Sequence, residues 1–248
     1  MLENTSYIPY DFRWKNYREP LMLAFTAGFI DAAGLLSMGI FICHITGNLI
    51  FSAVRVAGGD FIILARIISI FVFIIASALA SLTVRYFLYK KKNPLGFMFM
   101  LEGFFMFLCM LSGILLAPVK DSDSFAIILT VTFGVCAMGI RVSTNRLLFS
   151  KVPISTVMSG NTAQVAVDLL TLFLTKTKFS STIPSEDTIG ALSRTQLLFP
   201  FIIAFFVGAA FGAYGFHFIH YYCFFIPAFL VFILGVKEEL YSNSHSHK

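Results

Sequence analysis

Charged residues make up only 12% of this 248-residue chain, whereas 58% of its residues are hydrophobic and its mean hydropathy is +0.84. Soluble domains carry about 25% charged residues. The composition therefore excludes an ordinary soluble protein and predicts a single domain embedded in the lipid bilayer. The formal net charge of +5 does not indicate nucleic-acid binding, because positive charge in membrane proteins usually reports their topology.

The N-terminal stretch is polar and aromatic and carries Arg13, Lys15 and Arg18. It lacks the short apolar core and the cleavage site of a signal peptide. We expect residues 1–20 to form an amphipathic lead in the cytoplasm. One transmembrane domain is predicted to follow over residues 21–236.

The first half of this domain, about residues 21–117, contains three apolar segments that can each cross a bilayer, which requires roughly 20 residues. These segments are Leu21–Ile42, Phe61–Tyr89 and Leu95–Ala117. A weakly polar helical stretch, Leu49–Ala57, lies between the first two. About 12 residues of helix rise only about 18 Å, so this stretch is too short to cross.

The second half, about residues 125–236, repeats this order of segments. Its apolar segments are Phe125–Leu148, Leu197–Phe216 and Tyr221–Gly235, and its short helix is Asn161–Thr175. The stretch from Lys176 to Arg194 is rich in Ser and Thr and is predicted to be a loop. The polar tail, residues 237–248, is predicted to be disordered and cytoplasmic.

Two hydroxyl-Gly-Asn triplets mark corresponding points of the two halves. They are Thr46-Gly47-Asn48 and Ser159-Gly160-Asn161. Each triplet follows a long apolar segment with a central glycine, Gly28 or Gly139, and each opens a short helical run. A polar triplet that returns in the same context indicates an internal repeat.

The distribution of Lys and Arg indicates how the short helices sit, because these residues concentrate in cytoplasmic loops. If all eight segments crossed the membrane, one face would hold ten Lys and Arg residues and the other face would hold six. If the two short helices are re-entrant, one face holds fourteen and the other holds two, Arg55 and Lys120. The sequence thus predicts an all-α integral membrane protein with six transmembrane helices, two re-entrant half-helices in an inverted internal repeat, and both termini in the cytoplasm.

The triplets would then stand at the tips of the two half-helices. Thr46 or Asn48, and Ser159 or Asn161, are suitable N-caps, and the glycine between them permits a tight turn. Two helix N-termini that approach the midplane from opposite faces favour an anion or a polar solute through their free N–H groups. The alternative is that the triplets are two capped turns that pack together and bind nothing.

Charged residues inside the membrane are candidates for function. We expect Asp31 and Arg141 to be partners, in either a functional or a structural role. Arg66 and Glu102 form a second candidate pair, for which we favour a structural role. His44, beside the first triplet, titrates near neutral pH and is a candidate gate or proton relay.

Four cysteines lie in apolar stretches and form no CxxC pair: Cys43, Cys109, Cys136 and Cys223. This pattern predicts neither a metal site nor a disulfide framework. The chain also offers no nucleophilic triad, phosphate-binding loop or pair of catalytic carboxylates. We therefore predict a protein without enzymatic activity and without a cofactor.

Four short motifs carry a resemblance to a known family: Ala27-Gly28-Phe29-Ile30-Asp31, His44-Ile45-Thr46-Gly47-Asn48, Ala137-Met138-Gly139 and Ser159-Gly160-Asn161. At these residues the chain resembles the YoaK-like family of bacterial membrane proteins, which is defined as a domain of unknown function. The resemblance extends from about Leu21 to Gly235 and implies a bacterial inner-membrane location, with no established activity. Arg141 departs from the polar, uncharged residues that the family carries at this point.

These observations favour a small transporter or channel for an anionic or polar solute, with its site between the two half-helix tips. The residues predicted to line that site are Asp31, His44, Thr46, Gly47, Asn48, Arg141, Ser159, Gly160 and Asn161. The alternative is a membrane scaffold or accessory subunit without transport activity. A membrane-embedded enzyme ranks third because a catalytic set is missing. Self-association into a homo-oligomer is left open.

Overall fold

A computed structural model describes residues 18–116, 123–149, 156, 158–177 and 184–245 of the chain, and this part is helical without any strand. Its elements are α1 (Arg18–Met38), α2 (Ile45–Ala57), α3 (Leu64–Tyr89), α4 (Leu95–Leu116), α5 (Phe125–Leu148), α6 (Met158–Leu174), α7 (Ser185–Ile219), the short 3-10 helix η3 (His220–Phe224) and α8 (Phe225–His245). Five helical segments of the described part are long and apolar enough to cross a membrane. The fifth, Asp187–Ser242, covers most of α7, all of η3 and most of α8.

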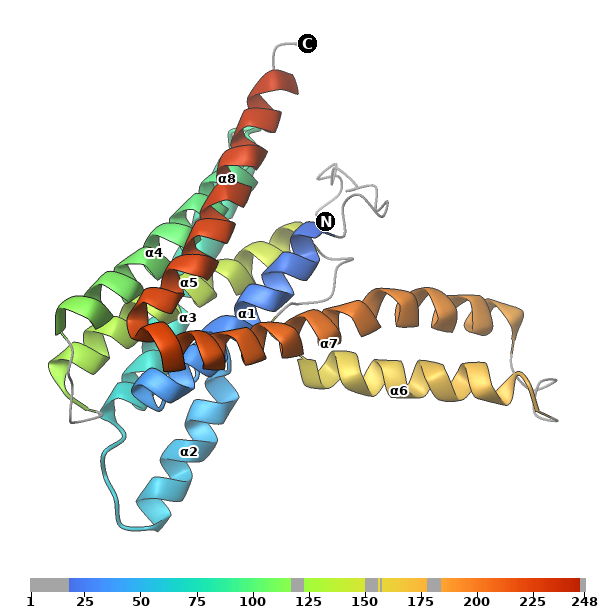
Figure 1. The fold of residues 1–248 in the computed structure, drawn as a ribbon. Helices are drawn as coiled ribbons and strands as arrows, with labels where there is room; N and C mark the ends of the chain where they lie inside the picture. The colour runs from blue at the N-terminus through green and yellow to red at the C-terminus, as the bar shows by residue number, and fades with distance from the viewer. Residues whose placement is uncertain (1–17, 117–122, 150–155, 157, 178–183, 246–248) are drawn as a thin grey trace.

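The long helices pack in pairs. α1 lies against α7, α4 lies against α8, and α5 lies against both α3 and α4. Their contacts surround one apolar core to which Phe29, Met106, Met138 and Phe224 contribute fully buried side chains. α6 packs against α7, and the two helices extend sideways from the bundle (Figure 1).

Contacts between helix ends define two opposite ends of the bundle. At one end, Lys237 of α8 makes an ion pair with Glu19 of α1 at 2.5 Å, and Glu239 lies beside Gly96 at the start of α4. At the other end, the Asp123 carboxylate accepts hydrogen bonds from the first backbone N–H groups of α3, at 2.8 and 3.0 Å. Asp123 lies two residues before the start of α5, so α1 and α5 begin at opposite ends and run in opposite directions.

Glycines allow two of the helix pairs to approach closely. A Cβ atom at Gly28 of α1 would overlap the Phe205 carbonyl of α7, and one at Gly208 of α7 would overlap the Phe25 carbonyl of α1. A Cβ atom at Gly139 of α5 would lie 2.9 Å from the Ala76 side chain of α3. Small residues bring membrane helices together in this way. Gly28 and Gly139, the central glycines of the two halves, therefore both lie at a close helix crossing.

The first helix ends earlier than Ile42, where the sequence predicts its end. Gly39 has a φ of +67° and its N–H donates to the Leu35 carbonyl at 3.0 Å. This left-handed conformation is a common helix terminator that glycine adopts without strain. Residues 40–44 then return without helical structure toward the start of α2.

Two other predicted boundaries are wrong. The predicted loop from Lys176 to Arg194 is helical from Ser185, since Arg194 on α7 binds Asp168 on α6 at 2.7 Å and ties this part of the chain to its neighbour. Residues 237–245, predicted to be disordered, belong to α8, where Lys237 binds Glu19 and Glu238 is buried. The predicted lead falls almost entirely on residues 1–17, which lie outside the described residues.

Candidate solute-binding cavity

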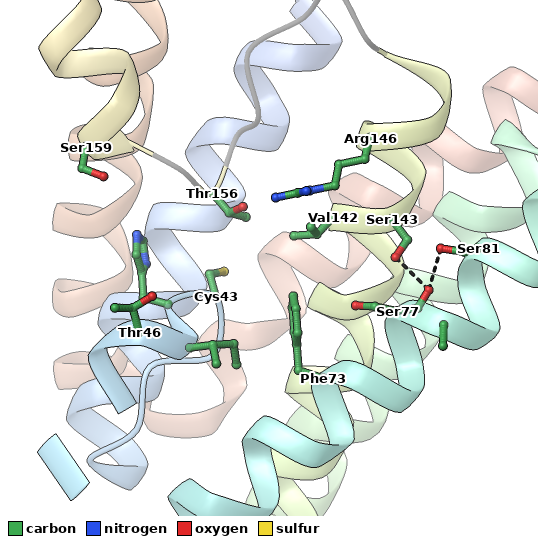
Figure 2. A pocket seen from close by; sticks show the side chains of 13 residues that line it. Cys43, Thr46, Phe73, Ser77, Ser81, Val142, Ser143, Arg146, Thr156 and Ser159 are labelled. Carbon is green, nitrogen blue, oxygen red and sulfur yellow. Dashed lines mark hydrogen bonds between the residues drawn. The ribbon is translucent and has the colours of Figure 1, made fainter. Parts of the chain in front are cut away.

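A cavity of about 590 Å³ lies among the start of α2, the middle of α3, the end of α5 and the start of α6 (Figure 2). Cavities of about 300–1,000 Å³ are typical of small-molecule sites. Six residues give its lining hydroxyl groups: Thr46, Ser77, Ser81, Ser143, Thr156 and Ser159. Ser77 lies near the midpoint of α3, so the cavity reaches the centre of a helix that is long enough to cross a bilayer.

Each triplet contributes one residue to this lining, Thr46 from the first and Ser159 from the second. Both residues occupy the first turn of their helices, α2 and α6. The first N–H groups of a helix have no acceptor within it and remain free for a ligand. The described residues thus bring two helix starts, from distant parts of the sequence, to one cavity.

The predicted capping role of the triplets is wrong for α2, because this helix begins at Ile45, four residues before the predicted start at Leu49. Its N-cap is His44, which makes no side-chain capping bond. Asn48 is buried and clamps the returning chain instead, since it accepts from the Phe41 N–H at 2.9 Å and donates to the Phe41 carbonyl at 2.7 Å. Gly47 packs on the same residue, and a Cβ atom there would lie 2.7 Å from the Phe41 ring.

The other two residues of the second triplet do not line the cavity. Gly160 is exposed and Asn161 is half-buried, and both lie within the first turn of α6 rather than at its N-cap. The Asn161 amide contacts the Met158 sulfur at 3.8 Å. Of the second triplet, therefore, Ser159 is the member positioned to meet a solute.

Asp31 lies behind the cavity wall and binds the segment that leads into α2. One carboxylate oxygen accepts a hydrogen bond from the Cys43 N–H at 2.6 Å. The other oxygen makes a close contact with Nδ1 of His44, a residue of the cavity lining. The predicted pairing of Asp31 with Arg141 is wrong, because the turn after α1 brings His44 back over this carboxylate.

Arg141 is fully buried and lies away from the cavity. Its Nε donates to Glu102 of α4 at 2.7 Å, and its Nη1 donates to the Leu23 carbonyl of α1 at 2.9 Å. Glu102 is therefore not the partner of Arg66, as the sequence suggested. Arg66 instead donates to the Gly39 carbonyl at 2.7 Å, where it satisfies the end of α1. These contacts give both arginines a structural role.

Arg146, which the sequence did not single out, is the cationic side chain of the cavity lining. It extends from the end of α5 toward Thr156 (Figure 2). Within the described part of the chain it has no hydrogen bond or ion pair. A guanidinium group with free donors beside hydroxyl groups is suited to bind an anion.

The serines on the opposite wall hold two helices together. Ser143 of α5 donates to the Ser77 carbonyl of α3 at 2.9 Å, and Ser81 donates to the same carbonyl at 2.8 Å. Their hydroxyl hydrogens are therefore directed at the backbone. Their oxygen atoms can still accept a hydrogen bond from a solute or a water molecule. The one sequence signal for this wall is the spacing of Ser77 and Ser81 on one face of an apolar helix.

Comparison with known families gives a match to the model described as "Protein of unknown function (DUF1275)" over residues 20–236. The chain belongs to this family. The predicted membership of a family of unknown function is thus confirmed, whereas the narrower YoaK-like assignment and a bacterial origin stay predictions. A search of the curated proteins found no match, and neither did a search of the solved structures.

The family match covers the whole of the candidate site. Its range contains both triplets, Arg146 and the Asp31–His44 pair, and it ends within α8. The membership itself assigns no activity, so the chemistry of the cavity has to indicate the function.

Proposed function

We propose that this protein is a membrane transporter or channel for a small anionic or polar solute, which passes through the cavity between α2, α3, α5 and α6. The observation that carries the proposal is the composition of the lining. Two helix starts, several hydroxyl groups and the guanidinium of Arg146, which has no partner among the described residues, converge on one cavity. A packing junction between apolar helices has no need of such a lining, since unpaired polar groups are costly in a membrane.

The arrangement of the helices supports an inverted repeat with six crossings. α1 of the first half packs against α7 of the second half, and the equivalent pair is α5 of the second half with α3 of the first half. The central glycines Gly28 and Gly139 lie at these two crossings, and α1 and α5 run in opposite directions. α7 and α8 each cross once in this proposal. α2, with 13 residues, rises about 20 Å and is re-entrant, and α6 is its counterpart.

The charges at the two ends support one orientation. The end that holds Glu19 and Lys237 also receives the Lys90-Lys91-Lys92 turn after α3, whereas Arg55 lies near the opposite end and is paired with Asp60 at 2.7 Å. Because positive loops remain in the cytoplasm, both termini are cytoplasmic in this proposal. The resemblance to the YoaK-like family favours the bacterial inner membrane as the location.

Labelling of single cysteines tests this orientation. In a variant whose four native cysteines are replaced by serine, Phe61→Cys should react with a membrane-impermeant maleimide in intact cells. Lys92→Cys should react only after the cells are permeabilised. Both positions are exposed at helix ends, so accessibility to water alone cannot explain a difference between them. Labelling of Lys92→Cys in intact cells contradicts the orientation.

Flux measurements in proteoliposomes test the function itself. The panel contains nitrate, iodide, methanesulfonate, glycerol and urea, and we expect flux of at least one of them. Thr46→Trp places an indole in the cavity and should abolish most of this flux. Thr162→Trp, at an exposed position one turn along α6 from the lining, is the matched control and should leave flux unchanged.

A folded protein that conducts none of these solutes contradicts the transport proposal. The scaffold or accessory-subunit reading then becomes the better one. Equal flux in the two Trp variants would show that the solute passes elsewhere. An enzymatic role is not part of the proposal, because the described residues of the lining offer no nucleophile hydrogen-bonded to a general base.

A further inference from the structure

His44 and Asp31 form a pair in which one ring nitrogen of His44 has no hydrogen-bond partner among the described residues. Nδ1 of His44 is held by the Asp31 carboxylate, and the second carboxylate oxygen is held by the Cys43 N–H at 2.6 Å. With Nδ1–H donating to Asp31, the lone pair of Nε2 is the position that can take up a proton. His44 belongs to the cavity lining and its side chain is 36% exposed, so this nitrogen can exchange protons with water that enters the cavity.

Few charged groups face His44. α1 supplies the charged neighbour Asp31. The aromatic rings of Phe41 and Phe205 lie with centroids 6.1 and 5.8 Å from the imidazole. The Cys43 thiol donates a hydrogen bond to the Ala27 carbonyl. The lining residues of α3 and α6 carry no charge, and α5 supplies Arg146. Within the described lining, the charge of the cavity is therefore set by the His44–Asp31 pair and by Arg146.

The charges of these groups balance in one of the two protonation states. With His44 neutral, the Asp31 carboxylate and the Arg146 guanidinium cancel. With His44 protonated, the same groups carry one net positive charge. A monoanion at Arg146 restores neutrality, and neutrality is strongly favoured where the dielectric constant is low.

Building on the proposed function, we propose that the solute is a small monoanion and that it moves together with one proton carried on His44. The anion binds the Arg146 guanidinium and the nearby hydroxyl groups, while the proton enters on Nε2 of His44 from the same aqueous side. Each increases the affinity for the other, because binding couplings are reciprocal. Both leave on the opposite side, so no net charge crosses the membrane.

Accumulation driven by a proton gradient tests this coupling in the unmodified protein. Proteoliposomes with the membrane potential clamped at zero by potassium and valinomycin receive a pH one unit lower outside than inside. Nitrate, iodide and methanesulfonate serve as probes because, as anions of strong acids, they cannot carry a proton themselves. One-to-one coupling predicts up to about tenfold accumulation of the transported anion, which a protonophore should abolish.

Two variants connect the coupling to the proposed residue. In His44→Gln the anion should equilibrate without accumulation, and the lumen should no longer acidify as the anion enters. His217→Gln changes an exposed histidine of α7 outside the lining and should behave like the wild type. If His44→Gln does not fold, accumulation in the wild-type protein still decides the coupling.

The outcomes separate this inference from the proposed function. Anion flux that reaches equilibrium but never exceeds it overturns proton coupling and leaves the transport function intact. Flux of glycerol or urea without anion flux overturns the anion assignment while the protein remains a transporter. Flux of no probe at all overturns both.

Discussion

Replacing Glu102 with glutamine should destabilise the protein by about 3–5 kcal/mol, the usual cost of removing one partner of a buried ion pair. Both side chains of the pair are fully buried, and Arg141 keeps its charge because a guanidinium is not deprotonated in proteins. The Leu23 carbonyl and the amide oxygen of the new glutamine can still accept its hydrogen bonds, but neither carries a charge that compensates the guanidinium. Thermal unfolding in detergent, followed with a thiol-reactive dye or by circular dichroism, measures the loss.

A double-mutant cycle shows whether Glu102 and Arg141 act as a pair. Arg141→Gln should cost less than Glu102→Gln, because a carboxyl group can become neutral by taking up a proton. The variant with both glutamines should be more stable than the sum of the two single changes predicts. Strictly additive costs would mean that the two residues stabilise the fold independently. Arg85→Gln, at an exposed site on α3, provides the surface control.

The crossing helices could be predicted from apolar length alone. The predicted segment Phe125–Leu148 coincides with α5, and Leu95–Ala117 differs from α4 by one residue. Length and hydropathy decide these elements because a membrane imposes a fixed thickness. The start of α7 was missed because its first residues are polar, and the salt bridge between Asp168 and Arg194 is a contact that local composition does not reveal.

Partners of buried charges were the least predictable feature. Asp31 and Arg141 follow the central glycines at similar spacing, which suggested that they meet. Spacing does not specify the face of a helix, however. Arg141 is directed at Glu102 of α4, and the turn after α1 brings His44 to Asp31. These pairings depend on the three-dimensional packing of the helices, which cannot be read from a single sequence.

For the candidate site, the triplets located the cavity but not its cationic residue. Thr46 and Ser159 line it as residues of two helix starts, whereas Asn48 is occupied with the Phe41 backbone. Arg146 was not singled out, because it stands near the end of α5. A terminal arginine and an arginine that reaches into a cavity look alike in sequence, since a long side chain can extend in either direction along the helix.

Replacing Arg146 with glutamine should raise the half-saturating concentration of the transported anion by about 10- to 100-fold. A hydrogen bond to a charged group contributes about 1.5–3 kcal/mol, and about 1.4 kcal/mol corresponds to a factor of ten in affinity. Arg146→Lys should lose less because it keeps the charge, although not the planar pair of donors. Concentration-dependent flux in proteoliposomes gives these values, and Arg85→Gln should match the wild type.

The same substitution should leave thermal stability nearly unchanged, in contrast to the buried pair of Glu102 and Arg141. Arg146 has no bond to another described residue, so its removal orphans no partner in that part of the chain, and surface-like changes of this kind fall within about 0.5 kcal/mol. A large loss of stability would assign Arg146 a structural role. An unchanged half-saturating concentration would mean that the anion does not bind at this guanidinium. If the anion binds at Arg146, the Arg146→Gln variant should transport the anion more weakly and keep its full thermal stability.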